Sequence, residues 1–222
     1  VLIVANEFFD ALPIDQYIMT REGWQERRIT TNQKQDDFLF KPCVPPAENN
    51  PIIPDELVDS PINSIFERSS AGEQIASDIA KRIATDGGAA LIIDYGHVRH
   101  GLGDTLQAVK SHNYHCPLAT IGEADLTAHI DFAALGNAAK ASGAIVHGPV
   151  FQGGLLTALG IEQRTKVLAA TATPDQAEIL ESASRRLIAA DGMGTLFKAM
   201  AITSVADSTP AGFEGYAVES VS

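Results

Sequence analysis

The sequence predicts an α/β fold in which a doubly wound, mostly parallel sheet carries a small antiparallel and loop insertion. Two uninterrupted apolar runs, 1–5 and 89–93, have the pattern of parallel strands that are covered on both faces. A helical pattern at 70–86 precedes the second run, and a helix followed by a buried strand is the unit of doubly wound folds. With 222 residues, of which 45% are hydrophobic, the chain can bury a sizeable core as one domain with an insertion.

The first apolar run leads directly into the segment Asn6-Glu7-Phe8-Phe9-Asp10-Ala11-Leu12-Pro13. Two acids therefore follow the carboxyl end of a strand, which is where ligands bind in open α/β sheets. Pro13 excludes a helix that continues through Leu12, so the segment is a turn. The residues alone are equally consistent with Glu7 as a solvated strand-end acid and Asp10 as an ordinary turn residue.

Residues 14–61 are expected to form the insertion. The runs 14–21 and 24–31 flank a glycine-containing turn and predict a β-hairpin, to which 37–41 adds a third strand. No crossover helix separates these strands, so they form an antiparallel unit outside the main sheet. The proline-rich segment 42–61 predicts a loop, either a lid or a mobile surface connection. The expected core of this unit consists of Trp24, Phe38 and Phe40.

A second acidic strand end is expected at the same edge of the main sheet. The preceding helix begins at the capping box Ser70-Ala71-Gly72-Glu73 and ends at Gly87-Gly88. The strand after it ends in Asp94-Tyr95-Gly96-His97, where Gly96 allows the backbone to pass close to a ligand. The segment 104–110 is expected to be a short helix or strand across the mouth of this site.

The second half of the chain continues the alternation of helices and strands. Asp131 is expected to cap an alanine-rich helix that runs to Ala141. Thr173-Pro174-Asp175-Gln176 predicts the start of another helix, with a capping threonine, a proline at the first position and a glutamine partner. The remaining expected elements are strands at 62–67, 144–150 and 196–202, a helix at 151–159 and a polar tail at 206–222.

Composition excludes several classes of function. A net charge of −12 repels a phosphate backbone, so nucleic-acid binding is not expected. No apolar run approaches the roughly 20 residues that a membrane-spanning helix needs. The two cysteines, Cys43 and Cys116, do not suggest a disulfide framework and indicate a reducing compartment.

No metal site is expected, although several zinc-type ligands lie near one another in the sequence. Pairs of histidines at this spacing occur in any loop, and no Cys-x-x-Cys pair accompanies them. The residues concerned are His97, His100, His112, His115 and Cys116.

Four segments together carry a family resemblance. They are Asn6 to Pro13 (NEFFDALP), Gly87 to His97 (GGAALIIDYGH), Gly103 to Gln107 (GDTLQ) and Asp125 to Phe132 (DLTAHIDF). In this order they resemble the MidA-like S-adenosylmethionine-dependent methyltransferases, whose mitochondrial members are complex I assembly factors that methylate an arginine of a complex I subunit. The resemblance implies a class I (Rossmann-like) methyltransferase fold, S-adenosyl-L-methionine as cofactor and protein arginine N-methylation as the activity. It extends to about Ile202.

One part of the pattern of such methyltransferases does not occur in this chain. Methyltransferases of this fold bind the cofactor through a glycine-rich turn after the first strand and an acid after the second, and no such turn precedes Glu7. Residues 1–205 are therefore expected to be the carboxyl-terminal part of the methyltransferase domain, with residues 14–61 on the substrate side. Most of the cofactor pocket is expected to lie in the missing part.

The resemblance also implies roles for individual residues. Glu7 is expected to grip the substrate guanidinium, with support from Asp10, because carboxylates bind guanidinium groups bidentately. Asn6 and Pro13 resemble a motif that other methyltransferases place beside the transferred methyl group. The expected substrate-side wall comprises Asp94, Tyr95, His97 and Asp131.

An alternative is a non-catalytic assembly or interaction protein that retains the methyltransferase fold. A hydrolase is not supported, because the sequence contains no G-x-S-x-G nucleophile elbow. The expected partner is a protein substrate, in the bacterial cytoplasm or in the mitochondrial matrix of a eukaryote. A homodimer is one option for the oligomeric state, and the exact acceptor residue and the symmetry of methylation stay open.

Overall fold

The computed structural model describes residues 1–34, 37–44, 52–110, 113–119, 121–204 and 209–214. Its central sheet has the order β1 (Leu2–Asn6), β6 (Ala89–His97), β12 (Phe197–Thr203) and β11 (Ile145–Phe151), with β10 (Ile130–Asp131) beside the end of β6. β1 and β10 run parallel to β6, whereas β12 runs antiparallel to both β6 and β11. All strands except β12 therefore share one direction, and the predicted mostly parallel sheet is confirmed.

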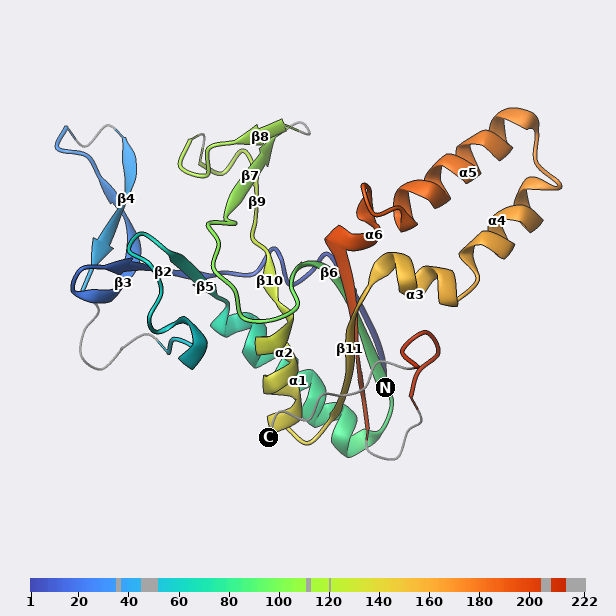
Figure 1. Cartoon of the computed structure of the whole chain (residues 1–222), viewed down its shortest axis with the longest axis horizontal. Helices are drawn as coiled ribbons and strands as arrows, with labels where there is room; N and C mark the ends of the chain where they lie inside the picture. Colours follow the sequence, from blue (N-terminus) through green and yellow to red (C-terminus); the bar gives the residue numbers. More distant parts are fainter. Residues whose placement is uncertain (35–36, 45–51, 111–112, 120, 205–208, 215–222) are drawn as a thin grey trace.

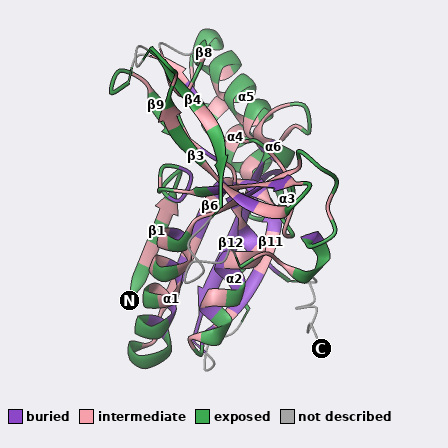
Figure 2. Ribbon diagram, turned by 90° about the vertical axis from the view of Figure 1, so that its left-hand side faces the viewer, coloured by how far each residue is buried: buried purple, intermediate pink, exposed green. Residues whose placement is uncertain are grey.

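Helices cover both faces of this sheet, as a doubly wound fold requires (Figure 1). On one face, α1 (Ser70–Asp86) and α2 (Phe132–Ala141) enclose the larger of the two clusters of buried apolar side chains (Figure 2). On the other face, α3 (Gln152–Ala158) packs with Phe213 over a smaller cluster. Phe213 is buried, so the segment predicted as a polar tail, 206–222, contains a core residue.

β1 departs from the prediction that both of its faces are covered. Ile3 and Ala5 pack against the core, but Leu2 and Val4 are 87% and 72% exposed. Among the described residues, β1 pairs with β6 alone and forms the edge of the sheet. An uninterrupted apolar run indicates two apolar faces, but it does not determine which segments cover them.

The insertion after β1 is a four-stranded antiparallel sheet with the order β4-β3-β2-β5. Its strands are β2 (Asp15–Thr20), β3 (Gly23–Thr31), β4 (Phe38–Cys43) and β5 (Ile65–Arg68), so the predicted hairpin and third strand are confirmed. The indole of Trp24 donates to the Leu57 carbonyl in the short helix η2 (Asp55–Leu57). Phe38 is 43% exposed, so its prediction as a core residue is wrong. Part of the predicted proline-rich loop, 45–51, lies outside the described residues.

Two further units follow β6 and β11. β7 (Gln107–Lys110) is the predicted element near the site, and it forms a small sheet with β8 (Asn113–His115) and β9 (Asp125–Thr127). Beyond α3, an arm consists of α4 (Ile161–Ala169), α5 (Pro174–Ile188) and α6 (Met193–Leu196) (Figure 1). α5 begins with the predicted capping box of Thr173 and Gln176. α4 was not predicted, and no side chain caps its first turn.

The start of α1 differs from the predicted capping box by one residue. Ser69, not Ser70, is the N-cap, and its hydroxyl accepts a hydrogen bond from the Gly72 amide at 3.1 Å. The same hydroxyl donates to the Pro13 carbonyl at 2.8 Å, which ties α1 to the turn after β1. Glu73 does not complete the box, because its carboxylate binds Arg68 through two 2.7 Å contacts.

Ser69→Ala should therefore lower the free energy of unfolding by about 1 kcal/mol, the usual loss when an N-cap hydroxyl is removed. Ser70→Ala is the matched control, because this neighbouring serine is exposed and lies in the first turn of the helix. Chemical denaturation of the three proteins measures the difference. Equal losses for the two variants would contradict the capping role of Ser69.

Candidate functional site

The turn between β1 and β2 carries the predicted catalytic acids at the carboxyl edge of the sheet. The Glu7 amide donates to the Ile93 carbonyl at 3.0 Å, which continues the pairing of β1 with β6. Glu7 itself has φ 47°, a left-handed conformation that residues other than glycine rarely adopt. Such strained residues cluster at functional sites and persist only where the surrounding structure holds them.

A buried carboxylate, that of Asp94, holds this turn in place. Oδ2 of Asp94 accepts hydrogen bonds from the amides of Phe9 at 3.1 Å and Asp10 at 3.2 Å, and Oδ1 accepts one from the Tyr95 amide at 3.0 Å. Asp94 is 0% exposed, so it supports the turn from below and does not face solvent. Burial, followed by repulsion from Asp10, raises the pKa of Asp94 to about 7.

Asp10 is the second carboxylate beneath the turn. The Tyr95 hydroxyl donates a hydrogen bond to Oδ2 of Asp10, and burial is the main cause that raises the pKa of Tyr95. Oδ1 of Asp10 is buried and has no hydrogen-bond partner in the described part of the chain. A buried carboxylate oxygen without a partner is costly, so Asp10 retains the capacity to accept one further hydrogen bond.

The predicted residues Asn6, Glu7 and Pro13 lie on the outside of the turn and are exposed. The Asn6 amide donates to Oε1 of Glu7 at 3.3 Å, and this is the one hydrogen bond of the Glu7 carboxylate in the described structure. The structure thus brings five predicted site residues to one strand edge. These residues are Asn6, Glu7, Asp10, Asp94 and Tyr95.

Sequence reasoning missed two basic side chains near this edge, His129, which packs against Tyr95, and Lys198, whose charge acts on His129. The ring of His129 is 5.4 Å from that of Tyr95 and 5.6 Å from that of the predicted residue His97. Burial, then the nearby His97 and Lys198, lowers the pKa of His129, and burial lowers the pKa of Lys198. His129 belongs to the segment DLTAHIDF noted above, but nothing in the spacing of that segment places it against Tyr95.

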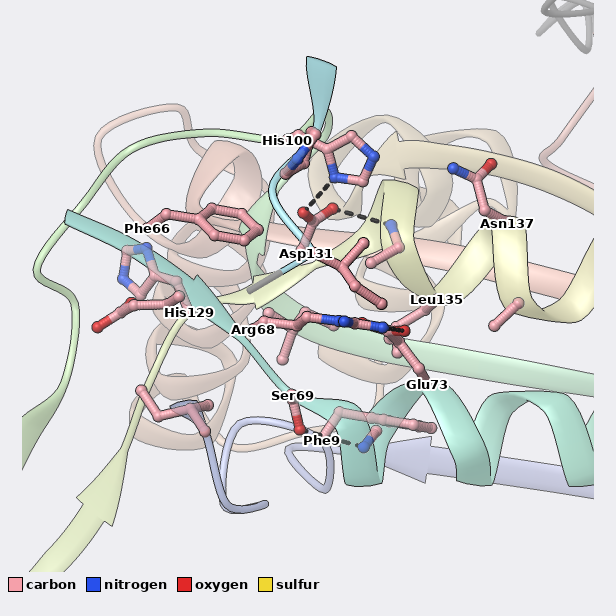
Figure 3. Close-up of a pocket in the computed structure, with 18 of the residues that line it drawn as sticks. Phe9, Phe66, Arg68, Ser69, Glu73, His100, His129, Asp131, Leu135 and Asn137 are labelled. Carbon is pink, nitrogen blue, oxygen red and sulfur yellow. Dashed lines mark hydrogen bonds and ion pairs between the residues drawn. The ribbon is translucent and has the colours of Figure 1, made fainter. Parts of the chain in front are cut away.

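Asp131 lies apart from the turn, in a cavity of about 450 Å³ between β5, α1 and α2 (Figure 3). Its Oδ1 accepts from the Ala134 amide at 3.0 Å, which confirms the predicted N-cap of α2. Its Oδ2 lies 2.6 Å from Nδ1 of His100. The cavity also contains the Arg68–Glu73 ion pair and is otherwise lined mainly by apolar side chains, including Phe9.

Two motif features have structural explanations in this region. Glu67 of β5 accepts hydrogen bonds from the amides of Thr105 and Leu106, which anchors the segment 103–107 above the site. A Cβ atom on Gly96 would lie 2.0 Å from the Ile130 carbonyl oxygen, so this glycine admits β10 beside β6. The close approach at Gly96 is therefore made by protein backbone and not, as predicted, by a ligand.

The described residues contain no group of three or more metal-binding side chains, and His112 lies outside them. No helix of the described structure is long and apolar enough to cross a membrane.

The sheet order, with antiparallel β12 between β6 and β11 and acids after β1 and β6, defines a class I (Rossmann-like) methyltransferase fold. A family model described as "Putative S-adenosyl-L-methionine-dependent methyltransferase" matches residues 1–150. The chain belongs to this family.

Known proteins agree with this assignment. The chain is 37% identical over 210 residues to the Drosophila melanogaster "Protein arginine methyltransferase NDUFAF7 homolog, mitochondrial". This alignment covers 90% of this chain and 46% of that relative. An uncharacterized protein from Burkholderia thailandensis matches with a TM-score of 0.82 and 26% identity, over 97% of this chain and 58% of that one. A structure from the same organism bound to S-adenosyl-homocysteine matches with a TM-score of 0.79 and 26% identity, over 97% and 56%. The chain thus spans less than half the length of the curated relatives it matches.

The raised pKa of Asp94 predicts a specific dependence of stability on pH. The ordinary value is 3.8 and the folded value is about 7, so between them the folded state holds a proton that the unfolded state lacks. This contribution to stability is fully present below about pH 4 and is lost as the pH rises through about 7. The free energy of unfolding of the wild type, minus that of Asp94→Asn, should therefore fall across this window in chemical denaturation. A difference that stays constant would contradict a raised pKa at Asp94.

Proposed function

We propose that this chain is part of an S-adenosyl-L-methionine-dependent protein arginine N-methyltransferase. The observation that carries the proposal is the exposed carboxylate of Glu7, held in a left-handed turn at the carboxyl edge of β1. The name of the Drosophila relative, which describes a protein arginine methyltransferase, supports the choice of arginine as acceptor. We place the acceptor in a subunit of respiratory complex I, with methylation needed for assembly of the complex, as the resemblance of the sequence motifs implies.

The proposed chemistry needs orientation of the acceptor more than it needs a strong base. A guanidinium group is a poor nucleophile because its lone pairs are delocalised and it stays protonated. Glu7 can bind it bidentately and direct one terminal nitrogen toward the methyl group. Phe8, which is 45% exposed beside Glu7, offers a ring face on which the planar cation can stack. The unpaired oxygen of Asp10 supports the charge from beneath the turn.

The residues of this chain can form one side of the cofactor site. Asn6 and Pro13 are exposed at the carboxyl edge, next to the uncovered face of β1, and they are our candidates for contact with S-adenosyl-L-methionine. That group supplies the methyl for transfer. The first glycine of the chain is Gly23, so residues 1–22 provide no glycine-rich cradle for it. We therefore propose that residues outside these 222 complete the cofactor pocket and that 1–205 form the carboxyl-terminal part of the domain.

The substrate side of the proposed site has two parts. Tyr95 contacts the turn through Asp10 and His97 lies beside His129, while Asp94 acts on the substrate only through the backbone of the turn that it holds. Asp131 and His100 line the cavity, which reaches the turn at Phe9 and also includes His129. We assign this cavity to side chains that flank the target arginine, with the insertion 14–61 on the same side.

The names of the eukaryotic relatives describe mitochondrial proteins. We accordingly place the protein in the mitochondrial matrix if its source is eukaryotic, or in the cytoplasm of a bacterium.

Glu7→Gln should reduce the rate of methyl transfer to an arginine peptide by at least about 100-fold, because the neutral amide cannot neutralise the guanidinium. Binding of the cofactor should change by less than about threefold. The assay uses the protein at the full length of its relatives, with radiolabelled methyl groups. Asp86→Asn is the control, because this exposed acid ends α1 at the opposite edge of the sheet. If Glu7→Gln abolishes methylation but leaves complex I assembly intact, the non-catalytic assembly role is correct.

Calorimetry tests the proposed division of the cofactor site. We expect S-adenosyl-L-methionine to bind to a protein of the relatives' length and at least about 100-fold more weakly to the 222-residue chain, since one wall supplies few of the contacts. Equal affinity for both would refute the division while leaving the enzyme proposal standing. Absence of binding to the longer protein would refute the enzyme proposal.

A further inference from the structure

The arm formed by α4 and α5 has an outer face that no described segment covers. It projects away from the central sheet, and neither helix contains a buried residue (Figures 1 and 2). Surface helices usually bury one apolar stripe, and α5 packs against α4, α3 and α6. The side of α5 that faces away from α4 is nevertheless exposed, and it shares no lining residue with the cavity of the candidate site.

This outer face of α5 is apolar at its centre and charged at both ends. Ile179 is 67% exposed, and Ser182 and Ala183 lie beside it on the next turn. Glu178 and Arg186 lie on the same side of the helix, one turn before and one turn after Ser182. Together these five side chains line a shallow hollow on the surface.

The order of charges along α5 makes this face complementary to itself. On this face Glu178 precedes the centre and Arg186 follows it, whereas Glu181 and Arg185 line the hollow that α5 shares with α4. Two copies of the helix, placed antiparallel about a two-fold axis at Ser182, bring each acidic half against the basic half of the other. In this register Glu178 faces Arg186 of the partner subunit, and the same contact occurs twice, as a two-fold interface requires.

The side chains at the centre permit close contact of the two helices. Ser182 and Ala183 are small, and the distance between packed helices depends on the size of the side chains where they cross. Ile179 of each copy then leaves water beside the axis, which adds hydrophobic burial to the paired charges.

We propose that α5 forms the interface of a homodimer in which two copies pack antiparallel about Ser182. A helix of fifteen residues is about 22 Å long, so the contact buries about 1,000 Å² in total, near the lower limit for specific interfaces. The dimer is consequently reversible, with a dissociation constant on the order of micromolar. The proposal is independent of methyl transfer.

Sedimentation velocity of the 222-residue chain tests this interface. The wild type should shift from 23.6 kDa toward twice that mass as its concentration rises from about 1 to about 100 μM. Glu178→Arg and Arg186→Glu should each raise the dissociation constant at least about tenfold, because each places like charges opposite one another twice. The double variant should return to within about threefold of the wild type.

The double variant separates pairing between copies from effects within one helix. Glu178 and Arg186 are eight residues apart in α5 and therefore do not interact within one helix, so recovery in the double variant can come only from contact with the partner. Glu162→Arg is the matched control, because this exposed acid lies on α4 beside the hollow on the other side of the hairpin. A wild type that stays monomeric, single variants that dimerise normally, or a double variant that does not recover would each overturn the proposal.

Discussion

The candidate site depends on one constraint, the fully buried carboxylate of Asp94. It receives three backbone amide hydrogen bonds, two from the turn after β1 and one from its own strand end. Those bonds hold Phe9 and Asp10 in position and so fix the direction in which the exposed Glu7 leaves the sheet. The carboxylate stays buried because backbone amides replace the hydrogen bonds that water would donate to it. These bonds do not fully offset the loss of water and the repulsion from Asp10, so the pKa of Asp94 is raised.

Much of the fold is predictable from local patterns, because apolar periodicity and capping residues act over a few positions. The hairpin of β2 and β3, the cap at Asp131 and the box at Thr173 are examples. The prediction for β1 was wrong about its surroundings, since Leu2 and Val4 are exposed in spite of a fully apolar pattern. The cap of α1 was misplaced by one residue because two adjacent serines are equivalent until the Pro13 carbonyl selects Ser69.

The candidate site was predictable only in part. Glu7 and Asp10 stand next to a recognisable strand end, so position in the sequence was sufficient to single them out. The support of their turn by Asp94 joins residues 85 positions apart, and no local pattern encodes such a contact. The same reason explains why His129, whose ring packs against those of Tyr95 and His97, and Lys198, whose charge acts on His129, were missed. Tertiary packing, which the sequence specifies only as a whole, brings these groups together.

The open flank of β1 has a consequence for how this polypeptide behaves in solution. Among the described residues β1 hydrogen-bonds on one side only, so its outer backbone groups are free to template an additional strand. The exposed side chains of Leu2 and Val4 make this edge strand apolar as well as unpaired. β1 contains none of the lysines or prolines that usually protect a sheet edge from pairing with another chain. A polypeptide in which this edge is uncovered is prone to aggregate by adding strands from other copies. A segment that pairs with β1 in register prevents this aggregation and also closes one side of the space beside Asn6.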